Sequence, residues 1–342
     1  MKGPGLKLRV FFWIILGTLT TFFAEVFAGS QLFPFFTAWG LGVVYPLYAV
    51  HLIVLGSFVF LKGRPRLYAL FPAGAIFGLY EAYITKVVWD PFWGIPMFSV
   101  GGIAVVETMV LVLFWHAFMA FIVPLLVAET LLTNSSEIRD GIPGWIKKVF
   151  GGRKRTLRLL VLIFILFGSF QSINTPSPAI SILSGLSSGL VPVILMYLWG
   201  RTSGPKYTMR ELLPGKRAFS VFFAMVMVIY LVLGVLLRPE TIPGLGPQAI
   251  VWVMYMFFFA LLGLTLKWSR KVKMPAVKGP PLKFSLRTFF LICAVVFALS
   301  SFLTKLIFPP FALLSVLVLW LGGIALGLVL LVLGLKNSLK RK

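Results

Sequence analysis

Long apolar segments recur along the whole chain and constrain its fold more than any other feature. Each has about 20 residues or more, enough for a helix rising about 1.5 Å per residue to cross a hydrocarbon core of about 30 Å. A segment in lipid has to satisfy its own backbone hydrogen bonds, so these segments are expected to be helices. The sequence therefore predicts an all-α, polytopic helical membrane protein. The ten predicted spans lie near residues 8–29, 38–61, 67–89, 102–132, 157–173, 179–199, 218–237, 248–267, 286–308 and 311–335.

The charges in the connecting loops support this number of spans. All but three of the 32 Lys and Arg residues lie in alternate loops, and the exceptions are Lys86, Arg238 and Lys305. Basic loops are retained on the cytoplasmic side of a membrane. The pattern predicts a multi-pass protein of the cell membrane with both termini in the cytoplasm.

The net charge of +23 indicates that the protein binds anionic groups. The basic residues lie in short loops between spans, so the expected partner is the anionic lipid headgroups on the cytoplasmic side rather than nucleic acid. The sequence also allows a membrane protein partner or a homo-oligomer. The single cysteine, Cys293, excludes an intrachain disulfide.

Polarity divides the chain into three predicted parts. Residues 1–132 form a polar four-helix membrane unit, 133–157 a basic cytoplasmic or interfacial loop, and 158–342 an apolar six-helix membrane unit. The first span imitates a cleavable signal peptide, but Glu25 beside the cleavage-like sequence favours an uncleaved helix. The segment 90–101 is either an outer loop or a re-entrant lid.

Ionisable residues gather in the first part and indicate where function lies. An ionisable side chain at the centre of a bilayer costs at least about 2.5 kcal/mol, so such residues are rare in spans without a role. The last six spans contain no acidic residue and no histidine. The residues of this group are Glu25, His51, Glu81, Asp90, Glu107, His116 and Glu129.

Helix rise gives the depth of five of them. Glu25, Glu107 and Glu81 lie about 6, 8 and 12 Å below the outer ends of their spans, and His51 and His116 lie about 20 Å deep. We therefore predict an outward-opening site, with Glu81, His116, Glu107 and His51 as its active residues. Lys86 and Glu25 are predicted to support it.

Five of these seven residues also have a structural explanation. Glu129 lies at the inner end of its span, where an interfacial acid near Arg139 is expected, and Asp90 is interpreted as an acid that ends a helix. Glu25 can extend towards water, while His51 and His116 can be histidines of the core with satisfied hydrogen bonds.

The residue types allow several functions. Three glutamates and one nearby lysine cannot all form ion pairs, so some carboxyl groups are expected to stay protonated. Such a site suits general acid–base catalysis of hydrolysis on a lipid, lipid-linked or peptide substrate. It also suits proton- or cation-coupled transport of a small solute, or a subunit for membrane-complex assembly. A divalent metal such as zinc is a further possibility, with Glu81, His51 and His116 as candidate ligands.

From Glu81 the chain reads Glu-Ala-Tyr-Ile-Thr-Lys, which resembles the Glu-Glu-x-x-x-Arg motif of the CAAX-prenyl-protease and bacteriocin-processing intramembrane family. The resemblance implies that Glu81 activates the attacking water, with Ala82 replacing the second glutamate and Lys86 the arginine. His116 corresponds to the histidine of the family's Phe-x-x-x-His motif, with Val112 in place of Phe. The family's later histidine motif has no counterpart.

A wider similarity is to uncharacterised prokaryotic polytopic membrane proteins. It rests on Ala24-Glu25-Val26 with Gly29-Ser30, on Gly78-Leu79-Tyr80-Glu81, and on a span that holds His116 and Pro124. This similarity implies the fold and the position of the site without naming a reaction.

Overall fold

The computed structural model describes residues 3–92, 94–150, 153–271 and 286–339. Within these ranges ten helical segments are long and apolar enough to cross a membrane, which confirms the predicted all-α, multi-pass class. They are Leu6–Val26, Gly40–Lys62, Leu67–Thr85, Val105–Leu132, Lys154–Asn174, Pro178–Thr202, Lys216–Leu236, Leu245–Lys271, Phe290–Ile307 and Pro309–Leu339.

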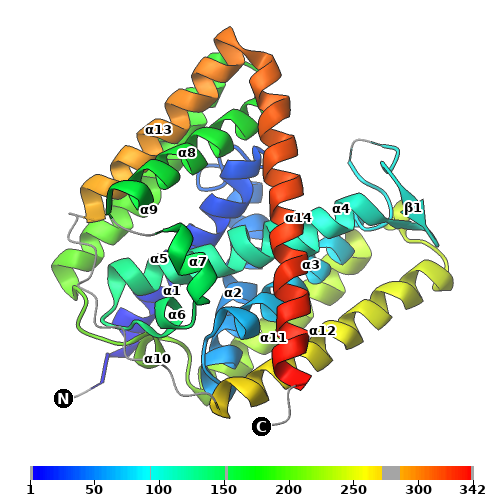
Figure 1. The fold of residues 1–342 in the computed structure, drawn as a ribbon, viewed down its shortest axis with the longest axis horizontal. Coiled ribbons are helices and arrows are strands. Elements are labelled where there is room, and N and C mark those ends of the chain that lie inside the picture. The colour runs from blue at the N-terminus through cyan, green and yellow to red at the C-terminus, as the bar shows by residue number, and fades with distance from the viewer. Residues whose placement is uncertain (1–2, 93, 151–152, 272–285, 340–342) are drawn as a thin grey trace. The chain divides into compact units, whose positions relative to one another are not determined.

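On either side of one connection the helices are a few residues shorter than the predicted spans. Helix α3 (Leu67–Thr85) ends before the predicted residue 89 because Lys86 has a left-handed backbone with φ of 65°. The next helix, α4 (Val105–Met109), begins after the predicted residue 102 because a hairpin precedes it. The hairpin consists of β1 (Ser99–Val100) paired antiparallel with β2 (Ile103–Ala104) and leads directly into α4 (Figure 1). The segment 90–101 thus contains turns and the first strand of this hairpin.

One compact unit comprises Met1–Ala49, Pro124–Leu212 and Met274–Leu321. Its helix α13 packs against α8 and α9, and Gly185 allows a close approach, since a Cβ there would lie 2.8 Å from the Cβ of Ala298. Phe27 stacks on Phe297 with ring centroids 4.4 Å apart. Its elements are α1 (Leu6–Thr21), η1 (Phe22–Val26), η2 (Gly40–Val44), α5 (Val123–Leu132), α6 (Glu137–Asp140), α7 (Gly144–Val149), α8 (Arg153–Gln171), η4 (Ser172–Asn174), α9 (Pro178–Thr202), α10 (Met209–Leu212), α13 (Leu286–Ile307) and the start of α14 (Pro309–Leu339).

The other compact unit comprises Val50–Val123, Leu213–Lys273 and Gly322–Lys342. Helix α3 is its central element and contacts η3, α11 and α12. The unit also contains the hairpin, α4, most of α2 and the end of α14. The bounds of these elements are Tyr45–Lys62 for α2, Val110–Ile122 for η3, Lys216–Leu236 for α11 and Leu245–Lys271 for α12, and the unit also contains η5 (Pro239–Thr241).

Both units draw on both halves of the sequence. The predicted division into 1–132, 133–157 and 158–342 rests on the polarity of the spans rather than on contacts between helices. It therefore stays a prediction. Glu81, Glu107, His51 and His116 all belong to the unit centred on α3.

Among the described residues, three segments of the spans are π-helical, with hydrogen bonds between residues five apart rather than four. They are η1, η2 and the 13-residue η3. The π-helix is rare, and where it occurs it is frequently found at functional sites. Two of the predicted site residues lie in such segments, Glu25 in η1 and His116 in η3.

Candidate functional site

Glu81 faces η3 because of a stripe of glycines on α3. Gly74, Gly78 and Glu81 are four and three residues apart, so they share one face of the helix. A Cβ at Gly74 would lie 2.7 Å from the Cα of Ala117, and one at Gly78 would lie 2.8 Å from the Cα of Val112. The two glycines therefore allow the backbones of α3 and η3 to approach closely, and Glu81 meets η3 one turn further along.

His116 lies on η3, opposite Glu81. Its Nε2 is 3.4 Å from Oε2 of Glu81, and its Nδ1 is 3.3 Å from the carbonyl oxygen of Leu111. The side chain of His116 is 2% exposed and that of Glu81 is 14% exposed. The structure thus brings together the two residues that the sequence singled out as a candidate base and its partner.

The carbonyl oxygen of Leu111 determines the protonation pattern of this pair. A carbonyl only accepts hydrogen bonds, so Nδ1 of His116 carries a hydrogen when it bonds to Leu111. In the neutral imidazole Nε2 then has only its lone pair, which faces Oε2 of Glu81 at 3.4 Å. In the charged imidazole Nε2 carries a hydrogen towards the same oxygen. A proton on either side of this contact would lie between Glu81 and His116.

His51 joins this pair through aromatic rings. Its ring lies 5.1 Å from that of Phe77 and 3.8 Å from that of Tyr80. Phe77 in turn lies 5.7 Å from the imidazole of His116. The two histidines therefore contact one phenyl ring, as their predicted common depth allows.

Glu107 lies in the first turn of α4 and is buried. Its Oε1 accepts a hydrogen bond of 2.9 Å from the backbone N–H of Met97. Its Oε2 is buried and has no hydrogen-bond partner among the described residues. Glu107 thus holds the segment that precedes the hairpin and keeps one carboxyl oxygen available.

Lys86 bonds to backbone rather than to the glutamates. Its buried Nζ donates to the carbonyl oxygens of Ile84 and Gly234, at 3.1 and 2.6 Å. Burial lowers the pKa of the ammonium below its usual value, and the positive charge of Arg238 adds to this effect. In the structure Lys86 therefore supports the backbone at the end of α3 and makes no ion pair with any glutamate that the structure describes.

Arg238 is a residue that the site prediction missed. It forms an ion pair with Asp90 and also donates to the carbonyl oxygen of Thr85 at 3.0 Å. Asp90 was interpreted as the end of a helix, but α3 ends at Thr85, and Asp90 lies in the turn that follows. Arg238 was one of three basic residues on the predicted outer side, and this exceptional position was the signal for a specific partner.

The two other acids of the group, Glu25 and Glu129, belong to the unit that contains α1. Glu25 accepts a hydrogen bond of 2.7 Å from the hydroxyl of Ser30. Glu129 accepts hydrogen bonds of 2.8 and 3.0 Å from the backbone N–H groups of Ile138 and Arg139. Glu129 lies beside Arg139, as predicted, and its buried carboxylate satisfies backbone N–H groups in the first turn of α6.

The donors near Glu81 do not fit a metal centre. Among the residues that the structure describes, no three His, Cys, Asp or Glu side chains lie in a group that could hold a metal ion. The predicted set of Glu81, His51 and His116 therefore lacks the arrangement that zinc requires.

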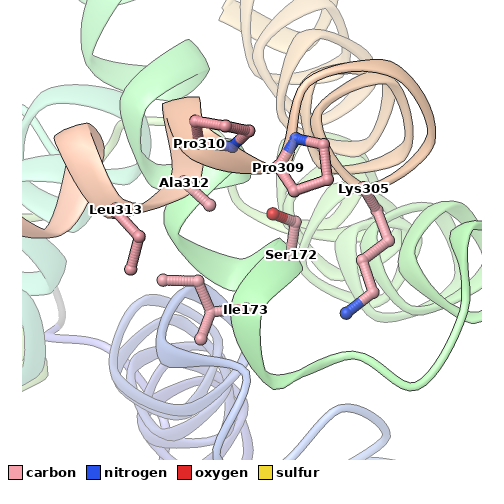
Figure 2. Close-up of a pocket in the computed structure, with 7 residues that line it drawn as sticks. All are labelled: Ser172, Ile173, Lys305, Pro309, Pro310, Ala312 and Leu313. Carbon is pink, nitrogen blue, oxygen red and sulfur yellow. The ribbon is translucent and has the colours of Figure 1, made fainter.

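One open cavity of about 350 Å³ lies elsewhere, in the unit that contains α13 (Figure 2). Its wall is apolar apart from Lys305 and Ser172, and the Ser172 hydroxyl donates to the carbonyl oxygen of Ser169 at 2.6 Å. It contains none of the predicted site residues. The lining residues are Ser172, Ile173, Lys305, Pro309, Pro310, Ala312 and Leu313.

Comparisons with known proteins agree with the fold. A family model described as an uncharacterized membrane protein family matches residues 14–342. An uncharacterized protein of Archaeoglobus fulgidus is 32% identical over 324 residues, which cover 94% of this chain and 96% of the relative. No solved structure matches the chain. The match over nearly the whole length, together with the ten membrane-type helices, shows that the chain belongs to this uncharacterized family of integral membrane proteins.

Proposed function

We propose that Glu81 and His116 form a proton-binding pair within the membrane, and that the protein couples proton movement to the transport of a small solute or cation. The observation that carries the proposal is the contact of both imidazole nitrogens, Nδ1 with Leu111 and Nε2 with Glu81. This arrangement stores one proton between two groups and leaves the imidazole without an open nitrogen.

The different burial of the two side chains suggests the route by which the proton reaches the pair. Glu81 is part-exposed whereas His116 is buried, so the proton enters and leaves through the carboxyl group. The buried imidazole stabilises the proton in either state, as a hydrogen-bond acceptor or as the cation of an ion pair. Chains of Glu and His that perform such exchange are typical of membrane transporters and pumps.

Glu107 supplies a second, buried carboxyl group in the same compact unit as Glu81. Its Oε2 is buried without a hydrogen-bond partner among the described residues, so a cation or a proton bound there would remove the cost of the unpaired oxygen. This supports coupling of the proton at Glu81 to a cationic or hydrogen-bonding solute near Glu107.

A hydrolase is the second candidate, and the exposure of Glu81 supports it. An ionised Glu81 can accept a proton from water, which frees the hydroxide for attack on an acyl carbon. The buried His116 would act as a positioning residue, because it fixes the carboxylate through Nε2. The resemblance around Glu81 to the intramembrane proteases agrees with this candidate.

Proton flux into vesicles tests the transport proposal. Purified protein is reconstituted with a pH-sensitive dye inside, and an outward gradient of sodium or of potassium is imposed. We expect cation-dependent proton uptake that Glu81→Gln abolishes and His116→Ala reduces at least tenfold. Glu240→Gln, which alters an exposed acid outside the spans, serves as the matched control and should retain the wild-type rate.

Hydrolysis is measured on the same preparations with a fluorogenic lipid ester and a prenylated peptide. Turnover that Glu81→Gln removes, without any proton flux, would replace the transport proposal by the hydrolase. Wild-type protein that shows neither proton flux under any cation gradient nor turnover would contradict both functions.

A further inference from the structure

An uncharged connection follows the outer end of α3. From Pro91 to Val106 the sequence contains no acidic or basic residue. Five large apolar side chains of this connection are exposed, and Ile95 is 87% exposed. We call them the apolar patch, which consists of Phe92, Ile95, Met97, Phe98 and Val100.

The backbone around the patch is held by its own hydrogen bonds. The N–H of Gly94 donates to Pro91 at 2.9 Å, and the N–H of Val105 donates to Phe98 at 2.9 Å. The N–H of Ala104 donates to Val88 at 2.8 Å. The exposure of the apolar side chains is therefore a property of an ordered turn and hairpin.

The hairpin turn fixes the direction in which the patch faces. Gly101 and Gly102 have φ of 58° and 79°, the pair of positive values that a two-residue type I′ turn requires. A Cβ on Gly101 would lie 2.8 Å from Cδ1 of Ile250, and one on Gly102 would lie 2.7 Å from Cγ of Pro247. The turn thus packs against the start of α12, while the patch stays uncovered by the described residues of this unit.

We propose that the apolar patch inserts into the outer leaflet of the membrane, at the boundary between headgroups and acyl chains. The partner is lipid because the patch directly continues two membrane-spanning segments, α3 and the one beginning with α4, and has no charge that would hold it in water. The depth is interfacial because non-helical backbone is excluded from the hydrocarbon core, whereas interfacial elements bury apolar side chains roughly 5–10 Å deep.

One hydrogen bond connects the inserted patch to the buried acid of α4. The N–H of Met97, in the middle of the patch, donates to Oε1 of Glu107. A movement of the patch in the leaflet would therefore change the hydrogen bond to the carboxyl group of Glu107. This proposal stands independently of proton transport.

Nitroxide labels in vesicles of phosphatidylcholine and phosphatidylglycerol test it. Cys293 is replaced by Ala, and a single cysteine is introduced by Ile95→Cys, by Phe98→Cys or, as an aqueous reference, by Glu240→Cys. Collisions with molecular oxygen report lipid, and collisions with a water-soluble nickel chelate report water. We expect oxygen collisions to predominate at Ile95 and Phe98 and nickel collisions to predominate at Glu240.

Two results would overturn the proposal. Nickel accessibility at Ile95 equal to that at Glu240 would place the patch in water. Protection of Ile95 and Phe98 from both reagents would show that a protein, a partner or a second copy of the chain, covers the patch. If Cys293→Ala fails to fold, Cys293→Ser provides a second background for the same measurement.

Discussion

The Nζ of Lys86 donates a hydrogen bond of 2.6 Å to the carbonyl oxygen of Gly234, which joins the end of α3 to α11. Lys86 also ends α3 by its left-handed backbone, so one residue both terminates the helix and ties it to its neighbour. The same geometry predicts the order of stability of two substitutions.

We expect Lys86→Ala to lower the free energy of unfolding by about 1–3 kcal/mol, because buried carbonyl groups lose their donor. Lys86→Gly should lie between wild type and Lys86→Ala, since glycine loses the same hydrogen bonds but tolerates the positive φ. Thermal unfolding in detergent measures the order. An alanine variant as stable as wild type would contradict the role of the ammonium.

The close approach of α3 to η3 predicts a steric effect at Gly78. An added methyl group would lie 2.8 Å from the carbonyl oxygen of Leu111 and from the Cα of Val112, and backbone cannot move aside cheaply. We expect Gly78→Ala to destabilise the protein by about 1–3 kcal/mol and to weaken proton exchange by separating Glu81 from His116.

Gly263 in α12 is the matched control for this substitution. Nothing lies within 4 Å of a Cβ built there, so Gly263→Ala should be neutral or stabilising by up to about 1 kcal/mol from helix propensity. Both variants are compared by thermal unfolding in one detergent. Equal stability of the two variants would show that the contact at Gly78 is not tight.

The Asp90–Arg238 ion pair predicts that substitutions of its two residues lower the stability by unequal amounts. Arg238 also donates to the carbonyl oxygens of Thr85 and Asp90, at 3.0 and 2.8 Å, so its removal breaks more than the ion pair. We expect Asp90→Asn to cost about 0.2–1 kcal/mol, because the pair is partly exposed, and Arg238→Gln to cost more. A double-mutant cycle on unfolding temperatures measures the coupling, and equal costs would contradict the bonds to backbone.

The hydrogen bonds of Glu211, which lies outside the spans, predict that the local stability of α10 depends on pH. Its carboxylate accepts hydrogen bonds of 2.8 Å from the backbone N–H and from the hydroxyl of Thr208, in the pattern of a capping box. These bonds lower the pKa of Glu211 below its usual value of 4.5. The resulting stabilisation of α10 is complete above the usual value and is lost as pH falls through the lowered pKa of the folded state.

Hydrogen exchange of the amides in α10 measures this effect, because the group is exposed and its contribution is local. Protection relative to Glu211→Gln should decrease as the pH is taken below 4.5. A difference between the two proteins that does not change with pH would exclude the carboxylate as the cause.

The spans could be predicted because a bilayer imposes the same length and composition on each of them. The connection after α3 could be predicted only as a loop or a lid over 90–101, because its uncharged, apolar residues from Pro91 onward resemble the end of a span in composition. The left-handed Lys86 and the glycine turn at Gly101 and Gly102 decide its path, and both are properties of backbone angles.

The members of the site could be predicted from the sequence, but their contacts could not. Helix rise placed Glu81 about 12 Å and His116 about 20 Å deep, yet their side chains lie 3.4 Å apart in the structure. Helix rise carries no lateral information, and Glu25, which was predicted to support the site, belongs to the other compact unit. The π-helical form of η3 also escaped prediction, since an apolar run has the same composition in either helical form.

The π-helical segment that carries His116 makes the site sensitive to the length of the chain. Each residue advances a helix by about 100° around its axis. Deletion of one residue between Leu111 and His116 would therefore turn the imidazole around the helix axis and away from Glu81. The 28-residue span Val105–Leu132 would still be long enough to cross the bilayer. A relative that keeps both residues but has lost one position between them would therefore retain the membrane fold without the proton pair.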